Sequence, residues 1–144
     1  MAEVSLSGVS TPTDRSVNTR AQQTATLRAS AATTTSYVAS SHVRVGQFQY
    51  VSLDFILTWV DSTSTEWYVE WSQDGTTWYR SLDYAVSGGT ITATLNSATI
   101  ANAASANWND GPIAVQDVYM RVFAKKTGGV GADTLAVTVT ALGL

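Results

Sequence analysis

The clearest pattern in the chain is an alternation of apolar and polar side chains between residues 48 and 82. Large apolar residues occupy every second position in two runs separated by a polar break at 61–65. They are Val51, Leu53, Phe55, Leu57 and Trp59 in the first run and Trp67, Val69 and Trp71 in the second. Successive side chains of a strand point to opposite faces, so each run predicts a β-strand with one apolar face.

A tight turn follows the second of these strands. Asp74-Gly75 is a favoured hairpin dipeptide, and Thr77–Leu82 is expected to return as a third strand. With an even number of loop residues Trp71 faces Trp78, which places Trp78 on the apolar face and Tyr79 on the polar face. An odd loop with a glycine bulge would put Trp78 opposite Glu70 and mix the two faces. The even loop is therefore expected.

The same reading predicts five further strands, at residues 24–29, 37–45, 90–95, 118–124 and 134–142. In the first, Ala25, Leu27 and Ala29 share a face, and Ser87-Gly88-Gly89 forms a turn before 90–95. Residues 96–112 are expected to be a long loop, with a helical turn near 98–104. Seven or eight strands without intervening helices predict an antiparallel β-sandwich, of jelly-roll or immunoglobulin-like type. The expected core comprises Leu53, Phe55, Leu57, Trp67, Val69, Trp71, Val122 and Val137.

Length and composition fit a single β-domain, since 144 residues with 44% apolar and 13% charged side chains can bury one core. The absence of cysteine excludes disulfides and thiolate metal sites. No run approaches the ~20 apolar residues of a membrane span, and the first twenty residues lack the pattern of a signal peptide. We therefore expect neither export nor a membrane partner.

The first 23 residues are interpreted as an N-terminal arm, and residues 24–144 as the sandwich. Sixteen of the first 41 residues are Ser or Thr, so this part has little apolar surface to bury. We expect the arm to lie against neighbouring subunits. The residues expected to make these contacts are Val4, Leu6, Val9, Arg15 and Arg20.

Charge differs between the two parts of the chain. Residues 1–45 carry a net charge of +2 and the remainder −5, which sum to the net −3 of the chain. Four scattered arginines are too sparse for a nucleic-acid footprint, and an acidic body would repel phosphate. This positive N-terminal part of the chain suits an acidic protein surface, although arginines retained for solubility explain the same pattern. A sandwich must also protect its strand edges, which favours a homo-oligomer, with a trimer preferred.

Candidate chemistry is sparse. His42 is the only histidine and lies in no nucleophile motif, and Glu66 and Glu70 would stand ~13 Å apart on one strand, too far for a glycosidase pair. No carboxylate series of calcium-loop type and no phosphate-binding glycine loop are present. We expect no enzyme activity, no cofactor and no metal site. Trp78 and Tyr79 are candidates for stacking on sugar rings, although aromatic residues at alternating positions more often fill a core.

Residues 72–78, with the pattern Ser-x-Asp-Gly-x-x-Trp, resemble a hairpin found in fibronectin-III-like, discoidin-like and many phage structural sandwiches. The wider combination of a Ser/Thr-rich arm, a Trp-rich acidic sandwich and no catalytic set resembles head decoration (cement) proteins of tailed bacteriophages. This resemblance implies a virion protein on the capsid exterior, assembled in the host cytoplasm and often trimeric. It would stabilise the shell by bridging subunits of the major capsid protein or other virion proteins.

The sequence is also compatible with two other functions. One is a carbohydrate- or receptor-binding sandwich of a phage tail or fibre, which would use Trp78 and Tyr79. The other, less favoured, is a glycoside-active enzyme.

Overall fold

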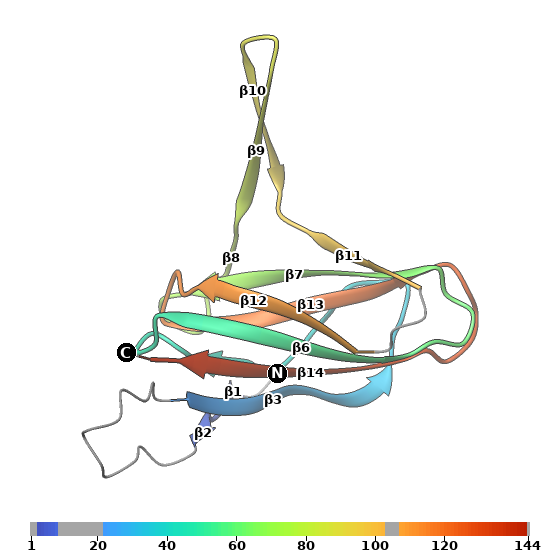
Figure 1. The fold of residues 1–144 in the computed structure, drawn as a ribbon, viewed down its shortest axis with the longest axis horizontal. Helices are drawn as coiled ribbons and strands as arrows, with labels where there is room; N and C mark the ends of the chain where they lie inside the picture. The colour runs from blue at the N-terminus through green and yellow to red at the C-terminus, as the bar shows by residue number, and fades with distance from the viewer. Residues whose placement is uncertain (1–2, 9–21, 103–106, 144) are drawn as a thin grey trace.

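The computed structural model describes residues 3–8, 22–102 and 107–143, and within these ranges the chain is all-β (Figure 1). The described ranges hold no helix, so they offer none that could cross a membrane. The strands are β1 (Glu3–Val4), β2 (Ser7–Gly8), β3 (Gln22–Ala32), β4 (Val38–Ala39), β5 (His42–Arg44), β6 (Tyr50–Thr58), β7 (Ser64–Ser72), β8 (Tyr79–Arg80), β9 (Leu82–Ser87), β10 (Thr90–Leu95), β11 (Ala98–Ala101), β12 (Asn107–Ala114), β13 (Tyr119–Thr127) and β14 (Thr134–Leu142).

Two sheets face each other and form a β-sandwich. One has the order β1-β5-β13-β7-β11, with β4 beside β13 and β8 beside β7, and the other has the order β12-β6-β14-β3-β2. Neighbours are antiparallel except β1 and β5, which are parallel. If β3, β5, β6, β7, β11, β12, β13 and β14 are numbered 1 to 8, the two sheets read 2-7-4-5 and 6-3-8-1. This is the strand order of a jelly roll, which decides between the two sandwich types left open by the sequence.

The core lies between the sheets and is built from the alternating positions predicted from the sequence. All eight residues expected to be buried are buried, and Phe55 of β6 packs against Trp67 of β7 with ring centroids 4.7 Å apart. Leu135 and Val139 of β14 and Met120 of β13 complete the same layer. Each long strand therefore contributes one apolar face to a single core.

The predicted register after β7 is wrong. The returning strand β8 has only two residues, and it pairs Trp71 with Tyr79 and Glu70 with Arg80. This differs from both registers considered, and it moves Trp78 off the core side. The reason is the turn: the Asp74 carboxylate accepts hydrogen bonds from the amides of Thr76 and Thr77, both at 2.8 Å, which adds residues to the loop before pairing begins.

The prediction of a long loop over residues 96–112 is also wrong. The chain there forms β11, which pairs with β7, and β12, which pairs with β6. No helical turn exists at 98–101, where the chain is extended, and residues 103–106 lie outside the described ranges. Both strands are sheet edges in the sandwich, so they need few large apolar side chains, and their Ala, Asn and Thr content concealed them.

The described part of the arm belongs to the sandwich of its own chain. β1 pairs with β5 and β2 pairs with β3, so residues 3–8 contact both sheets. Val4 and Leu6 are half-buried against the core of their own chain. From the sequence, these two side chains were expected to contact neighbouring subunits. In β3, Ala25 and Leu27 are buried as expected, but Ala29 is exposed because the register with β14 shifts between Thr26 and Arg28 and again between Arg28 and Ala31.

Candidate functional site

A two-stranded ribbon stands away from the sandwich and is its most prominent surface feature (Figure 1). This projecting hairpin is formed by β9 and β10, residues 82–95, which pair with each other and with no other described strand. Gly88 and Gly89 both have positive φ, 57° and 77°, which matches a two-residue turn between twisted strands. In chain order the projecting hairpin is an insertion between β7 and β11 of one sheet.

The two faces of the projecting hairpin differ sharply in polarity. Cross-strand partners lie on the same face, and the partners Leu82 and Leu95, Tyr84 and Ala93, and Val86 and Ile91 define what we call the apolar face. Its five large side chains are 44–71% exposed. The opposite face carries the partners Asp83 and Thr94, Ala85 and Thr92, and Ser87 and Thr90. Residues 90–95 form the predicted strand, and both faces of the projecting hairpin are exposed in the described structure.

The base of the projecting hairpin is fixed to the sandwich. The Arg80 guanidinium stacks on Tyr68, with its carbon 3.6 Å from the ring centroid, and Nε donates to the carbonyl of Asn96 at 2.6 Å. The Asn96 amide donates to the carbonyl of Ser81 at 2.8 Å, and the Asn96 side chain donates to both Asp83 carboxylate oxygens. These contacts set the direction in which the ribbon leaves the body.

The turn that resembles phage and fibronectin-type hairpins is held by Asp74. Its carboxylate accepts hydrogen bonds from the Ser72 hydroxyl at 3.0 Å and the Thr77 hydroxyl at 3.2 Å, as well as from the amides of Thr76 and Thr77. The backbone amides of Thr77 and Thr76 are the main cause of a pKa for Asp74 well below its ordinary value. The motif therefore has a structural role, which is to shape the turn.

The two candidate sugar-stacking residues do not form a joint platform. Trp78 is half-buried, with the Arg121 guanidinium carbon 4.2 Å from its ring centroid and the His42 ring edge-on at 5.5 Å. Tyr79 is exposed and lines a pocket of about 270 Å³ together with Trp71. Adjacent residues of an extended chain point to opposite sides, so the two rings are separated.

The outer face of the sheet around β7 and β13 is a surface of paired charges and stacked rings. Arg121 binds Glu70 at 2.8 Å, Lys125 binds Glu66 at 3.1 Å, and Tyr68 stacks on Phe123 with centroids 5.0 Å apart. Hydrogen bonds from Lys125 and from Tyr37 hold the pKa of Glu66 below its ordinary value. A general acid needs a raised pKa, so this carboxylate is unsuited to that role.

Two aspartates near the opposite end of the sandwich are occupied by backbone groups. Asp61 accepts from the amides of Val130 and Gly131 at 2.8–2.9 Å, and the buried Asp133 accepts from the Val60 and Asp61 amides and from the Ser62 hydroxyl. Burial raises the pKa of Asp133, but these hydrogen bonds lower it by more. Among the described residues no group of three His, Asp or Glu side chains is placed to hold a metal ion.

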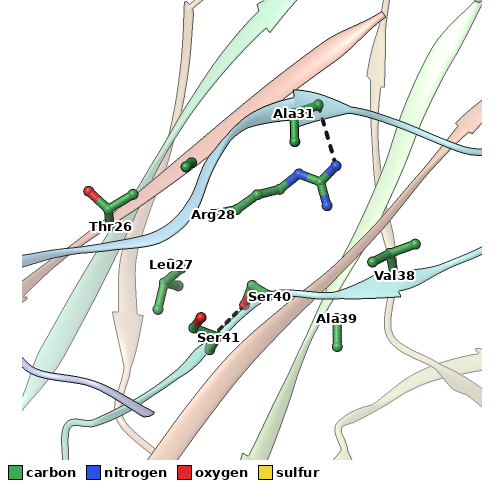
Figure 2. A pocket seen from close by; sticks show the side chains of 9 residues that line it. Thr26, Leu27, Arg28, Ala31, Val38, Ala39, Ser40 and Ser41 are labelled. Carbon is green, nitrogen blue, oxygen red and sulfur yellow. Dashed lines mark hydrogen bonds between the residues drawn. The ribbon is translucent and has the colours of Figure 1, made fainter. Parts of the chain in front are cut away.

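A pocket of about 410 Å³ opens along the side of the sandwich between β3 and β4 (Figure 2). Arg28 lines it, and Figure 2 shows its guanidinium donating to the backbone carbonyl of Ala31, at 3.4 Å. The same guanidinium also donates to the backbone carbonyls of Leu135 at 3.2 Å and Ala32 at 2.8 Å. The remaining lining is mostly small, including Ala31, Ala39 and Ser40. Because its one charged group is turned to backbone carbonyls of its own chain, this pocket offers few groups for recognising a ligand.

None of the site residues predicted from the sequence lies in the projecting hairpin. Val4 and Leu6 lie against the core, while Val9, Arg15 and Arg20 lie outside the described residues. The sequence reasoning missed the projecting hairpin as a site, although a signal was present. Leu82, Tyr84 and Val86 mirror Ile91, Ala93 and Leu95 across Gly88-Gly89.

Comparison with known proteins finds a likeness in structure and none in sequence. No protein-family model matches the chain, and no curated protein sequence matches it. The solved structure "Crystal structure of SPBc2 prophage-derived protein YomS" is similar, with 17% identity and a TM-score of 0.45, over 88% of this chain and 96% of that one. A likeness at this level carries no argument about function.

Proposed function

We propose that this protein is a non-enzymatic structural protein of a bacteriophage virion, which decorates the capsid exterior and stabilises the shell by bridging neighbouring capsid subunits. The observation that carries the proposal is the projecting hairpin, with five large apolar side chains held in solvent on a fixed base. Contiguous exposed apolar surface on a folded protein marks an interaction site. A protein that assembles with other subunits can bury such an apolar ribbon against a partner.

The arrangement of charged groups supports a structural role over a catalytic one. Glu66 and Glu70 are paired with Lys125 and Arg121, and Asp133 is enclosed by hydrogen-bond donors. His42 packs edge-on against Trp78 and Tyr119. In the parts of the chain that are described, each of these groups is therefore engaged by a partner within the fold.

The charge distribution supplies the second part of the proposal, the contact with the capsid. The chain is positive over residues 1–45 and negative beyond. Arg15 and Arg20 are proposed to contact acidic surfaces of the capsid subunits, together with Val9. Electrostatic contacts of this kind weaken as salt rises.

Co-sedimentation with purified capsids of the phage that encodes the chain tests this proposal. The full chain is expected to sediment with the capsids and to raise the temperature at which they open. Arg20→Glu should weaken binding about tenfold and reduce its salt dependence, because it removes an attractive contact and adds a repulsive one. Arg44→Glu makes the same charge change on an exposed position of β5 and should bind as the unaltered chain does.

The proposal fails if the full chain does not bind capsids at physiological salt. It is replaced by the carbohydrate-binding alternative if a glycan array shows sub-millimolar sugar binding that Tyr79→Ala or Trp78→Ala abolishes. Equal loss of capsid binding in Arg20→Glu and Arg44→Glu would remove the specific role given to the arm.

A further inference from the structure

One open side of the sandwich carries a groove, which lies between β12 of one sheet and β7 and β11 of the other. It consists of two adjoining hollows of about 180 and 240 Å³, which share Trp67 and Asp110 in their lining. Its position follows from the pairing of β7, where β11 covers the edge up to Trp67 and β8 covers it only from Glu70. Val69, between them, lines the smaller hollow and has no strand neighbour on that edge in the described chain. The projecting hairpin leaves the sheet at this gap, so its insertion opens the groove.

The groove combines exposed aromatic surface with hydrogen-bonding side chains. The partners of Trp108 and Asp110 in β6 are the buried Phe55 and Leu53. Because cross-strand partners lie on one face, Trp108 and Asp110 both point to the inner side of β12, toward the groove. Trp108 is 39% exposed, and the Asp110 carboxylate accepts no hydrogen bond from any described residue. The other polar residues of the lining are Ser81, Asn96, Thr99, Asn109 and Gln116. A ring and a carboxylate free to accept thus lie roughly 7 Å apart along one strand.

The side chains of the groove are suited to a neutral ligand rich in hydroxyl groups. Among the described residues that line it, only Asp110 is charged, so an anionic ligand would be repelled. The Asn96 side-chain oxygen accepts, and the Gln116 side-chain nitrogen donates, no hydrogen bond within the described chain. A hydroxyl group can donate to Asp110 and Asn96 and accept from Gln116. An ammonium ion only donates, so it would leave the Gln116 amide without an acceptor in the ligand.

The strand edge beside the groove is unsuited to an extended peptide as the occupant. A peptide that adds to a sheet needs successive backbone donors and acceptors along the edge. Pro112 of β12 has no N–H, and the register of β12 with β6 shifts between Asp110 and Ile113. Recognition in this groove therefore depends on side chains. A sugar ring matches them, because its C–H face packs on an indole and its hydroxyls project from the rim.

We propose that the groove binds a neutral oligosaccharide, with one sugar ring packed on Trp108 and a hydroxyl of that ring donating to the Asp110 carboxylate. The smaller hollow, which Trp71 lines, holds the adjoining ring. The candidates named from the sequence, Trp78 and Tyr79, line neither hollow. The inference goes beyond the proposed function, because capsid contacts are assigned to the arm and not to this groove. The two proposals therefore concern different residues and can fail separately.

Isothermal titration calorimetry of the full chain tests the proposal with neutral hexasaccharides of glucose, galactose, mannose and N-acetylglucosamine. We expect at least one of them to bind with a Kd below about 1 mM. Trp108→Ala should weaken that binding about tenfold or more, because it removes the ring on which the sugar packs. Trp78→Ala, the matched control, removes a half-buried tryptophan of the outer face and should bind as the unaltered chain does. Thermal melting of each variant verifies that it is folded.

Asp110→Asn gives a second test, which preserves the shape of the groove. It should weaken sugar binding about tenfold, because a charge-assisted hydrogen bond becomes a neutral one. Asp54→Asn makes the same charge change on the outer face of β6, where Asp54 lies opposite Asn109, and should keep the full affinity.

The inference is overturned if none of these hexasaccharides binds, or if Trp78→Ala lowers the affinity as much as Trp108→Ala does. Equal affinity of Asp110→Asn and Asp54→Asn also overturns it. So does tighter binding of a sialylated hexasaccharide, or of choline, than of every neutral sugar. A chain that binds capsids but none of the sugars would overturn this inference while the proposed function stands.

Discussion

Phe55→Ala is expected to lower the free energy of unfolding by about 3–5 kcal/mol, the usual cost of deleting a buried aromatic side chain. Phe55 is 1% exposed and packs on Trp67 across the two sheets. The remaining core comes from strands of a jelly roll that are fixed by hydrogen bonds on both sides, so it cannot readily collapse into the space. Urea denaturation followed by tryptophan fluorescence, at one fixed protein concentration, measures the change.

Ile56→Ala is the matched control for this experiment. Ile56 is the next residue of β6, points to the opposite face and is 55% exposed. Its truncation should change the free energy of unfolding by less than about 0.5 kcal/mol, as for ordinary surface positions. A loss below about 1 kcal/mol for Phe55→Ala, or a larger loss for Ile56→Ala, would mean that the faces of β6 are assigned the wrong way round.

The strands that build the core could be read from the sequence because their alternation uses large side chains. β6, β7, β13 and β14 each present at least two large apolar side chains at alternate positions, and burial follows that pattern. A one-residue slip would expose the whole set, so the pattern fixes the face as well as the strand. The class of fold follows from this. The strand order came only from the pairings.

The register of β8 could not be read in this way, because a side chain determines the length of the turn. The Asp74 carboxylate captures the amides of Thr76 and Thr77, and pairing starts only at Tyr79. An Asp-Gly pair indicates that a turn is present, but the number of residues in it depends on these hydrogen bonds. Trp78 therefore lies on the outer face, next to Arg121, and not on the apolar face that was predicted.

The projecting hairpin shows a different limit of sequence reasoning. The alternation in 90–95 correctly predicted a strand, but the same alternation serves a face that packs in a core and a face that packs on another molecule. Only the three-dimensional position of β9 and β10, away from both sheets, distinguishes the two cases. The edge strands β11 and β12 were missed for the opposite reason, because edge positions do not require large apolar residues.

Asp133→Ala is the second substitution for which we expect a large effect, a loss of about 3 kcal/mol in the free energy of unfolding. Asp133 is 1% exposed, and its carboxylate joins residues 60–62 to the start of β14. Alanine leaves the Ser62 hydroxyl and two backbone amides without acceptors, and buried hydrogen bonds to a charged group contribute about 1.5–3 kcal/mol each. Asp133→Asn retains one carbonyl oxygen for the amides, so its cost should be smaller, about 1–2 kcal/mol.

The pH dependence of stability separates the charge of Asp133 from its shape. The folded pKa of Asp133 lies below its ordinary value of 3.8. Its contribution is therefore complete above that value and is lost as pH falls from 3.8 through the folded pKa. Urea denaturation between pH 2 and pH 6 should show a smaller acid loss for Asp133→Asn than for the unaltered chain. Asp74 and Glu66, whose pKa values are also lowered, contribute to acid loss in both proteins. Identical acid profiles for the two proteins would show that the Asp133 carboxylate is not held in its charged form by these hydrogen bonds.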